Sequence, residues 1–315
     1  MAQALGPRVE WQVGSRGRRS TWWEQTYLPG AIRRAGIDVF FAAGYTAPVF
    51  CPTPFLVALY DVSFAAHPEW FGWRDGFRRR VLARLAAKRA AAVVTISQFS
   101  ADEITRYFDV PRTRLVLAPP GAPDRRPPAA DAPRPPVVLF VGSLFNRREI
   151  PLLIQGFART SRDVPGARLI LVGDNRTSPP IDPRLEAERA GVADRVEWRA
   201  YVPDAELEQL YAGARVFAFL SRYEGFAMTP LEAIARDVPA VLLDTPVSRE
   251  VYGDGARLVT ADAEAVAAAL TPLLTDDAAH GEQLARGLPL LTRYSWAAAA
   301  QSIQQALEAA ARGPA

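Results

Sequence analysis

The chain has 315 residues, enough for two domains of ordinary size, each with its own core. Hydrophobic residues make up 49 % of the sequence and charged residues 23 %, a profile typical of a soluble globular protein. The net charge of +3 gives no strong field toward nucleic acid, so nucleic acid is not an expected partner.

Two further features of the composition bear on location. Cys51 is the single cysteine, which excludes an intrachain disulfide and favours a reducing compartment, so we expect a cytoplasmic protein. No signal peptide is apparent at the N-terminus. The most apolar stretch, residues 39–60, is interrupted by one glycine and three prolines, and it predicts two short buried strands rather than a membrane-spanning helix.

Short apolar runs predict a small parallel α/β domain in residues 1–120. Its strands are predicted at residues 38–41, 55–59 and 92–96, with a helix at 75–89 and one weak strand at 8–13 before them. We expect this domain to be incomplete at its N-terminal edge. A proline-rich linker at residues 121–136 follows, since proline fits neither a helix interior nor a central strand.

The pattern after the linker predicts a second, doubly wound domain over residues 137–293. Its apolar strands alternate with helices, which is typical of a parallel sheet covered on both faces. The strands are predicted at residues 137–141, 168–172, 196–198, 216–220 and 239–243. The helices between them are predicted at residues 151–160, 183–190, 204–212 and 230–236, and a closing helix, within residues 294–315, at 296–311.

The strongest candidate site follows the fourth of these strands, because ligands of open parallel sheets bind beyond the carboxyl ends of strands. Gly225 allows a close backbone approach, and Thr229 before Pro230 predicts a helix start whose N–H groups suit a phosphate. Glu224 and Glu232 flank this turn and could accept hydrogen bonds from sugar hydroxyls. Spacing alone leaves a second interpretation open, a capping box in which Glu232 satisfies its own helix terminus.

These residues resemble a known family. Glu224 and Glu232, with seven residues between them in YEGFAMTPLEA, are similar to the E-x7-E signature of retaining GT-B glycosyltransferases, family 4, with mannosyltransferase-like members. Further segments resemble other landmarks of that family, in order from about residue 25 to 310: YDVSFAAHPEWF, TISQFSADEI, VGSLFNRREIPLLIQGF, YVPDAELEQLYAGARVFAFLS, GDGARLV and RYSWAAAA.

The resemblance implies a GT-B fold, with two Rossmann-like domains facing a cleft, and a role for each matched residue. Glu232 would bind the donor ribose, Glu224 a hydroxyl of the transferred sugar, and Arg148 with Arg147 the diphosphate. Asp61 is a further catalytic candidate at the cleft, with a simple turn role as the alternative. The remaining donor-binding candidates are Gly142, Ser143, Gly225, Phe226, Met228, Thr229, Tyr201 and Val202.

The implied activity is retaining transfer of a hexose, with mannose as the best candidate, from a nucleotide-diphosphate sugar to a glycan or lipid-linked acceptor. Arginines and a helix start would stabilise the leaving diphosphate, so neither a metal nor a cofactor is expected; the chain has no Asp-x-Asp motif. Tyr60 stands where the family usually has a histidine, and together with the incomplete N-terminal edge it permits an alternative, a non-catalytic GT-B nucleotide-binding or partner subunit. A dehydrogenase lacks support, because Gly-x-Gly-x-x-Gly follows none of the strands.

Residues 70–89 combine tryptophans with many arginines. Such a segment suits peripheral contact with an anionic membrane, here the inner membrane face. A helix packed on its own sheet with a solvated basic face is the alternative interpretation.

Overall fold

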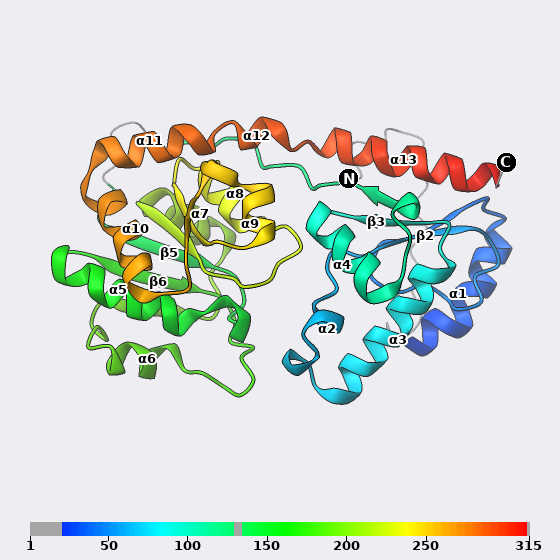
Figure 1. Ribbon diagram of the computed structural model, residues 1–315, viewed down its shortest axis with the longest axis horizontal. Coiled ribbons are helices and arrows are strands. Elements are labelled where there is room, and N and C mark those ends of the chain that lie inside the picture. Colours follow the sequence, from blue (N-terminus) through cyan, green and yellow to red (C-terminus); the bar gives the residue numbers. More distant parts are fainter. Residues whose placement is uncertain (1–20, 129–133, 314–315) are drawn as a thin grey trace. The chain divides into compact units, whose positions relative to one another are not determined.

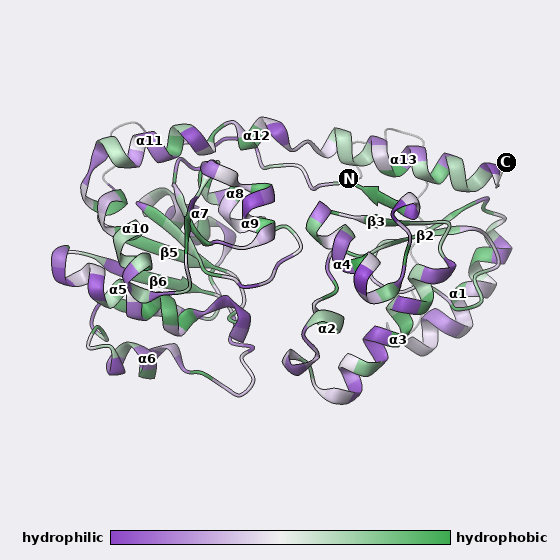
Figure 2. Ribbon diagram, viewed as in Figure 1, coloured by the Kyte–Doolittle hydropathy of each residue, from purple (hydrophilic) through white to green (hydrophobic). Residues whose placement is uncertain are grey.

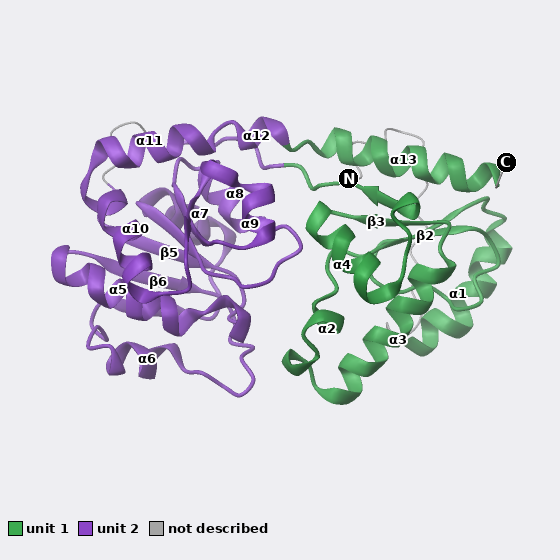
Figure 3. Ribbon diagram, in the orientation of Figure 1, with its two compact units in different colours: residues 1–121, 294–315 green, residues 122–293 purple. Residues whose placement is uncertain are grey.

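The computed structural model describes residues 21–128 and 134–313 (Figure 1). The weak strand predicted at residues 8–13 lies outside the described residues. The chain divides into two compact units (Figure 3). Unit 1 comprises Met1–Gly121 together with Tyr294–Ala315, and unit 2 comprises Ala122–Arg293.

Unit 1 contains a parallel sheet in the strand order β1-β2-β3-β4. The strands are β1 (Phe40–Ala42), β2 (Phe55–Ala58), β3 (Ala92–Thr95) and β4 (Leu115–Leu117). Val57 of β2 pairs with Val93 of β3, and Val94 pairs with Val116 of β4. The prediction of a parallel α/β domain here is confirmed, although β4 was not predicted.

Helices cover both faces of this sheet. Val57 and Val93 face one side, where they pack in one cluster with Ala83 and Ile104. The helices of that side are α2 (Ser63–Ala66), α3 (Trp73–Arg89) and α4 (Gln98–Phe108). Neighbouring strand residues such as Leu56 point to the opposite face, where the last helix, α13 (Trp296–Arg312), packs against them. The C-terminal helix therefore completes unit 1.

A helix at the start of unit 1 corrects the sequence prediction, which placed no helix before residue 35. Helix α1 spans Thr21–Ala35 and contains Pro29. Of its residues only Ile32 is buried, so the helix has almost no apolar periodicity for the sequence to reveal.

Unit 2 is the doubly wound domain that the sequence predicts. Its six parallel strands have the order β10-β9-β8-β5-β6-β7, so the direction of winding reverses between β5 and β8. The four central strands, β9, β8, β5 and β6, are buried over most of their length, whereas the edge strands β10 and β7 are only partly buried. The apolar residues of β5 and β6 can be followed in Figure 2. The strands are β5 (Val137–Val141), β6 (Arg168–Val172), β7 (Val196–Arg199), β8 (Val216–Phe219), β9 (Ala240–Leu243) and β10 (Arg257–Val259).

Helices of unit 2 lie on both faces of the sheet, with α5 and α10 in close contact. Gly156 of α5 makes this possible, because a Cβ there would lie 2.4 Å from Val266 of α10. The helices are α5 (Ile150–Asp163), α6 (Pro183–Arg189), α7 (Asp204–Gly213), α8 (Thr229–Ile234), α9 (Pro246–Val251), α10 (Ala263–Thr275), α11 (Asp277–Gly287) and α12 (Leu290–Arg293). None of the described helices is long and apolar enough to cross a membrane.

Candidate functional site

The topological switch point of unit 2 brings two loops together. β5 and β8 are neighbours in the sheet, yet their crossovers run in opposite directions, and ligands of such sheets bind at the carboxyl ends of these strands. The loop after β5 carries Arg147 and Arg148, and the loop after β8 carries Glu224. The backbone N–H of Arg222 donates to the carbonyl of Arg147 at 2.8 Å, which joins the two loops directly.

Arg148 is the centre of this cluster. Its Nε donates to Oε1 of Glu224 at 3.0 Å, and its Nη1 donates to the carbonyl of Ser143 at 2.8 Å. The guanidinium lies 4.9 Å from the ring centroid of Phe219 and 5.5 Å from that of Phe145. Burial lowers the pKa of Arg148 from its ordinary value, and Glu224 acts in the opposite direction. Arg148 is therefore a cation that two hydrogen bonds hold in position, with little exposure to solvent.

Gly142 makes room for this arginine. It has φ of +144°, a conformation that side chains rarely allow, and a Cβ at this position would lie 2.5 Å from Nη1 of Arg148. Gly173, after the adjacent strand β6, is equally restricted, because its Cβ would lie 2.1 Å from the carbonyl oxygen of Gly142. The loop after β5 thus depends on two positions without side chains.

Glu224 is held by one of its two carboxylate oxygens. Oε1 accepts from Arg148 and from the hydroxyl of Ser221 at 2.9 Å, and Nε of Arg147 lies 3.8 Å away. Arg147 also donates to the carbonyl of Tyr223 at 3.1 Å. Within the described chain, Oε2 of Glu224 has no hydrogen-bond partner. The cluster joins two guanidinium groups to one carboxylate, which leaves it with net positive charge.

Glu232 belongs to a second group of contacts. Its Oε2 accepts a hydrogen bond from the hydroxyl of Tyr211 at 3.1 Å, and the guanidinium of Arg236 lies over the Tyr211 ring at 4.7 Å. Burial, followed by the charge of Glu232, raises the pKa of Tyr211, so its hydroxyl stays protonated and donates. Oε1 of Glu232 is without a protein partner among the described residues. Tyr211 was not among the predicted site residues, because its position on α7 resembles that of an ordinary core residue.

The capping-box interpretation of Thr229 and Glu232 is wrong. Helix α8 begins at Thr229 with Met228 as its N-cap, and no side chain caps it. Thr229 therefore lies inside the first turn, and its buried hydroxyl has no partner in the described structure. The Glu232 carboxylate does not cap the helix and instead accepts a hydrogen bond from the hydroxyl of Tyr211.

The remaining candidates of unit 2 are placed unequally. The side chain of Phe226 is buried, and Gly225, Met228 and Thr229 adjoin it in the loop and at the start of α8. Tyr201 is exposed after the edge strand β7, whereas Val202 is part of the core. Among the described contacts, neither of these two residues touches the Arg148 cluster.

Asp61 lies in unit 1 and makes local contacts. Its Oδ1 accepts from the backbone N–H of Ser63 at 2.8 Å, which stabilises the turn before α2, and its Oδ2 accepts from the hydroxyl of Tyr45 at 3.1 Å. Tyr60 donates to the carbonyl of Ala43 at 2.6 Å. These contacts correspond to the turn role that the sequence left open for Asp61.

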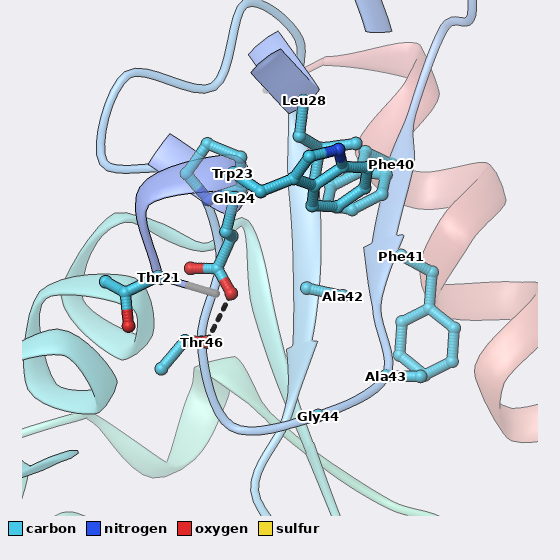
Figure 4. Close-up of a pocket in the computed structure, with 11 residues that line it drawn as sticks. Thr21, Trp23, Glu24, Leu28, Phe40, Phe41, Ala42, Ala43, Gly44 and Thr46 are labelled. Carbon is cyan, nitrogen blue, oxygen red and sulfur yellow. Dashed lines mark hydrogen bonds between the residues drawn. The ribbon is translucent and has the colours of Figure 1, made fainter. Parts of the chain in front are cut away.

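Unit 1 also has a cavity of about 410 Å³ between α1 and the carboxyl end of β1. Figure 4 shows Trp23, Leu28 and Phe40 gathered at one end of it, and Glu24 directed toward Thr46. The hydroxyl of Thr46 donates to Oε2 of Glu24 at 2.7 Å. Aromatic rings beside a carboxylate can contact both the faces and the hydroxyls of a sugar.

The part of the chain that the structure describes contains no candidate metal-binding site. No group of three or more histidine, cysteine, aspartate or glutamate side chains there is arranged to hold an ion.

Solved structures with the same arrangement define the fold class. Sucrose-phosphate synthase from Thermosynechococcus elongatus matches 92 % of this chain and 79 % of its own, with a TM-score of 0.71 and 19 % identity. The HepE protein of Anabaena, solved with UDP and glucose, matches 92 % of this chain and 83 % of its own, with a TM-score of 0.73 and 18 % identity. The fold is therefore GT-B, as predicted.

Sequence comparison gives the family. Residues 4–126 match the model of Glycosyltransferase Family 4, and residues 135–276 match that of glycosyl transferases group 1. The chain belongs to the family 4 glycosyltransferases.

Several curated relatives are named as mannosyltransferases. O-antigen chain mannosyltransferase B of Escherichia coli is 31 % identical over 66 % of this chain and 58 % of its own length. Mannosylfructose-phosphate synthase of Agrobacterium fabrum is 30 % identical over 58 % of this chain and 44 % of its own length. The chain spans about half the length of the curated relatives it matches. The non-catalytic alternative finds no support in these relatives.

Proposed function

We propose that this protein transfers a hexose from a nucleotide-diphosphate sugar to a glycan or lipid-linked acceptor, with retention of the anomeric configuration. The observation that carries the proposal is the cluster at the switch point of unit 2, in which Arg147, Arg148 and Glu224 meet beside Gly142. Mannose is the proposed hexose, because O-antigen chain mannosyltransferase B is among the relatives.

The charge of the cluster suits the leaving group. Breaking a glycosyl–phosphate bond leaves negative charge on the diphosphate, and preorganised cations lower the barrier most where that charge develops. Arg147 and Arg148 supply two guanidinium groups in a partly buried position. We therefore assign the diphosphate to these arginines and to the backbone of Gly142 and Ser143.

The carboxylates suit hydroxyl groups. Glu224 and Glu232 each have one oxygen bound to the protein and one without a partner among the described residues. An ionised carboxylate only accepts hydrogen bonds, and the ribose and the hexose both supply donors. We assign Glu232 to the ribose and Glu224 to the hexose. The backbone of Gly225, Phe226, Met228 and Thr229 would line the donor, and Tyr201 with Val202 would lie near the base.

Retention in this proposal needs no protein nucleophile. The leaving phosphate would take the acceptor proton on the same face of the sugar, unlike hydrolases, which use two carboxyl groups across the bond.

The position of the proposed donor site also suggests a role for each unit. Unit 2 would be the donor domain, ending near residue 293, and unit 1 the acceptor domain, with the cavity beside Glu24 as its candidate pocket and Asp61 as a catalytic candidate. Residues 121–136 would be the linker.

A lipid-linked acceptor would require the protein at a bilayer. We therefore also propose a cytoplasmic protein at the inner membrane face.

The experiment is a binding and turnover screen with nucleotide sugars. Thermal shift identifies the donor, since a ligand at 100 times its dissociation constant adds about 2.7 kcal/mol of stability. Product analysis with the selected donor then reports transfer and anomeric configuration. A donor that stabilises the wild type and Arg148→Ala equally would contradict the diphosphate assignment.

A further inference from the structure

Helix α3 has a second apolar face, which is exposed in the described structure. Four large side chains stand on it, with exposed fractions from 79 % at Trp73 to 37 % at Leu85. They recur every fourth residue, which places them in one row along the helix. The row consists of Trp73, Phe77, Val81 and Leu85.

The face of α3 that packs against the sheet of unit 1 is a different one. It buries small residues, among them Gly76, Ala83, Ala86 and Ala87. Amphipathic surface helices normally have one apolar stripe, which faces the core. The exposed row is therefore not explained by packing within the described part of unit 1. A row of exposed large apolar side chains marks an interaction site.

Cations surround this row. Helix α3 contains seven basic residues and one acidic residue, Asp75. Asp75 pairs with Arg78 at 2.6 Å and with Arg79 at 2.7 Å, and Asp109 pairs with Arg84 and Lys88. Two carboxylates thus face seven cations, and the surface keeps a clear positive excess. The charged ends of such side chains can extend outward while their stems cover apolar surface.

Exposed aromatic residues extend the row at both ends. At the start of α3, Arg78 donates to the hydroxyl of Thr21 at 3.2 Å, and the neighbouring Trp22 is exposed. At the end, the guanidinium of Arg89 lies 5.5 Å from the ring centroid of Phe50, which is also exposed. We call the row with Trp22 and Phe50 the α3 surface.

We propose that the α3 surface docks unit 1 on an anionic lipid bilayer. The helix would lie parallel to the membrane plane, with the apolar row at the boundary of the acyl chains and the cations at the headgroup phosphates. In this arrangement both the apolar row and the cations of α3 contact the bilayer. A nucleic-acid partner would contact the cations but would not require a continuous apolar row. The inference rests on the peripheral location proposed above and is independent of the chemistry of transfer.

Vesicle flotation of the full chain tests the proposal, without donor or acceptor. The wild type should float with vesicles of phosphatidylcholine and phosphatidylglycerol, and it should remain unbound with phosphatidylcholine alone. The paired variant Trp73→Ser with Phe77→Ser should reduce the binding by more than about ten-fold, because both side chains would contribute buried apolar area. Arg74→Glu with Lys88→Glu should reduce it similarly and make the remaining binding insensitive to salt.

Leu185→Ser with Arg189→Glu is the matched control, since it removes one exposed apolar and one basic side chain from α6 in unit 2. This control should bind vesicles like the wild type. All three variants should keep the wild-type melting temperature and donor-induced thermal shift, which separates lipid docking from failure of the proposed function. Equal flotation of the wild type and the Trp73/Phe77 variant would overturn the proposal. So would a wild type that does not float but forms a dimer that the same variant dissociates, because the surface would then be a protein interface.

Discussion

The hydroxyl of Tyr211, a side chain inside the core of unit 2, holds one oxygen of the Glu232 carboxylate at 3.1 Å. The ring of Tyr211 in turn lies beneath the guanidinium of Arg236. This arrangement fixes the direction of Glu232 from behind and leaves its other oxygen for a ligand. Tyr211 is thus a positioning residue for the proposed ribose contact.

Tyr211→Phe should weaken donor binding by about ten-fold, because a hydrogen bond to a charged group contributes roughly 1.5–3 kcal/mol. The measurement is isothermal titration with the donor's nucleoside diphosphate. Tyr107→Phe, in unit 1, removes a comparable hydroxyl and should leave the affinity unchanged. A normal affinity in Tyr211→Phe would show that Glu232 needs no support from Tyr211.

Arg148→Ala should reduce donor affinity by more than about ten-fold, since it removes the proposed diphosphate contact and a hydrogen bond to a charged group contributes roughly 1.5–3 kcal/mol. Arg148→Lys should recover part of the loss, because the charge returns but the two-point geometry does not. Arg159→Ala is the matched control, as Arg159 forms an exposed ion pair with Glu264 on the outside of unit 2. Affinity measured for the three variants separates a diphosphate contact from a general effect of charge.

Gly142→Ala should impair both folding and binding. The new methyl group would collide with Nη1 of Arg148, and the φ of +144° would be strained, so we expect a loss of stability of about 1–3 kcal/mol. Gly213→Ala serves as the control, because a Cβ there meets no atom within 4 Å and its helical position favours alanine. Chemical denaturation should thus show opposite signs for the two variants, and two variants of equal stability would contradict the steric argument.

The stability of the folded protein in mild acid should depend on His280. Burial, followed by the charges of Arg215 and Arg134, lowers the pKa of His280 below its ordinary value of 6.5. The unfolded chain then binds this proton more readily than the folded chain, so stability should fall as the pH drops below 6.5. His280→Gln should flatten the melting-temperature curve between pH 7 and pH 5.5, where histidine titrates and most carboxyl groups do not. An unchanged slope would exclude His280 as the cause.

The sequence predicted the core strands of unit 2 closely. The predicted strands at residues 137–141 and 168–172 contain the continuous apolar runs 137–141 and 169–172, each followed by a glycine, and the structure has strands with the predicted bounds. The strand β10 (Arg257–Val259) was missed, because three residues with an exposed arginine give too short a pattern. Helix α1 was missed for the opposite reason: it is long but buries only one residue.

The site residues that lie in motifs shared with the family were predicted. Glu224, Arg147 and Arg148 were expected at one place, and the structure brings them into contact across the two loops. Tyr211 could not be inferred, because its role depends on the packing of α7 beside α8, which no spacing in the sequence encodes. The alternative that Thr229 opens a capping box could not be excluded from the sequence, because helix starts are uncertain by a residue or two.

The return of α13 to unit 1 has a consequence for biosynthesis. Unit 2 is one uninterrupted segment, so all its strands and helices are available to fold once residue 293 has left the ribosome. The sheet of unit 1 must wait with Leu56 and Val94 uncovered until residues 296–312 have left the ribosome, after the whole of unit 2. Unit 1, although it begins first in the sequence, can therefore complete its fold only after unit 2 has been synthesised.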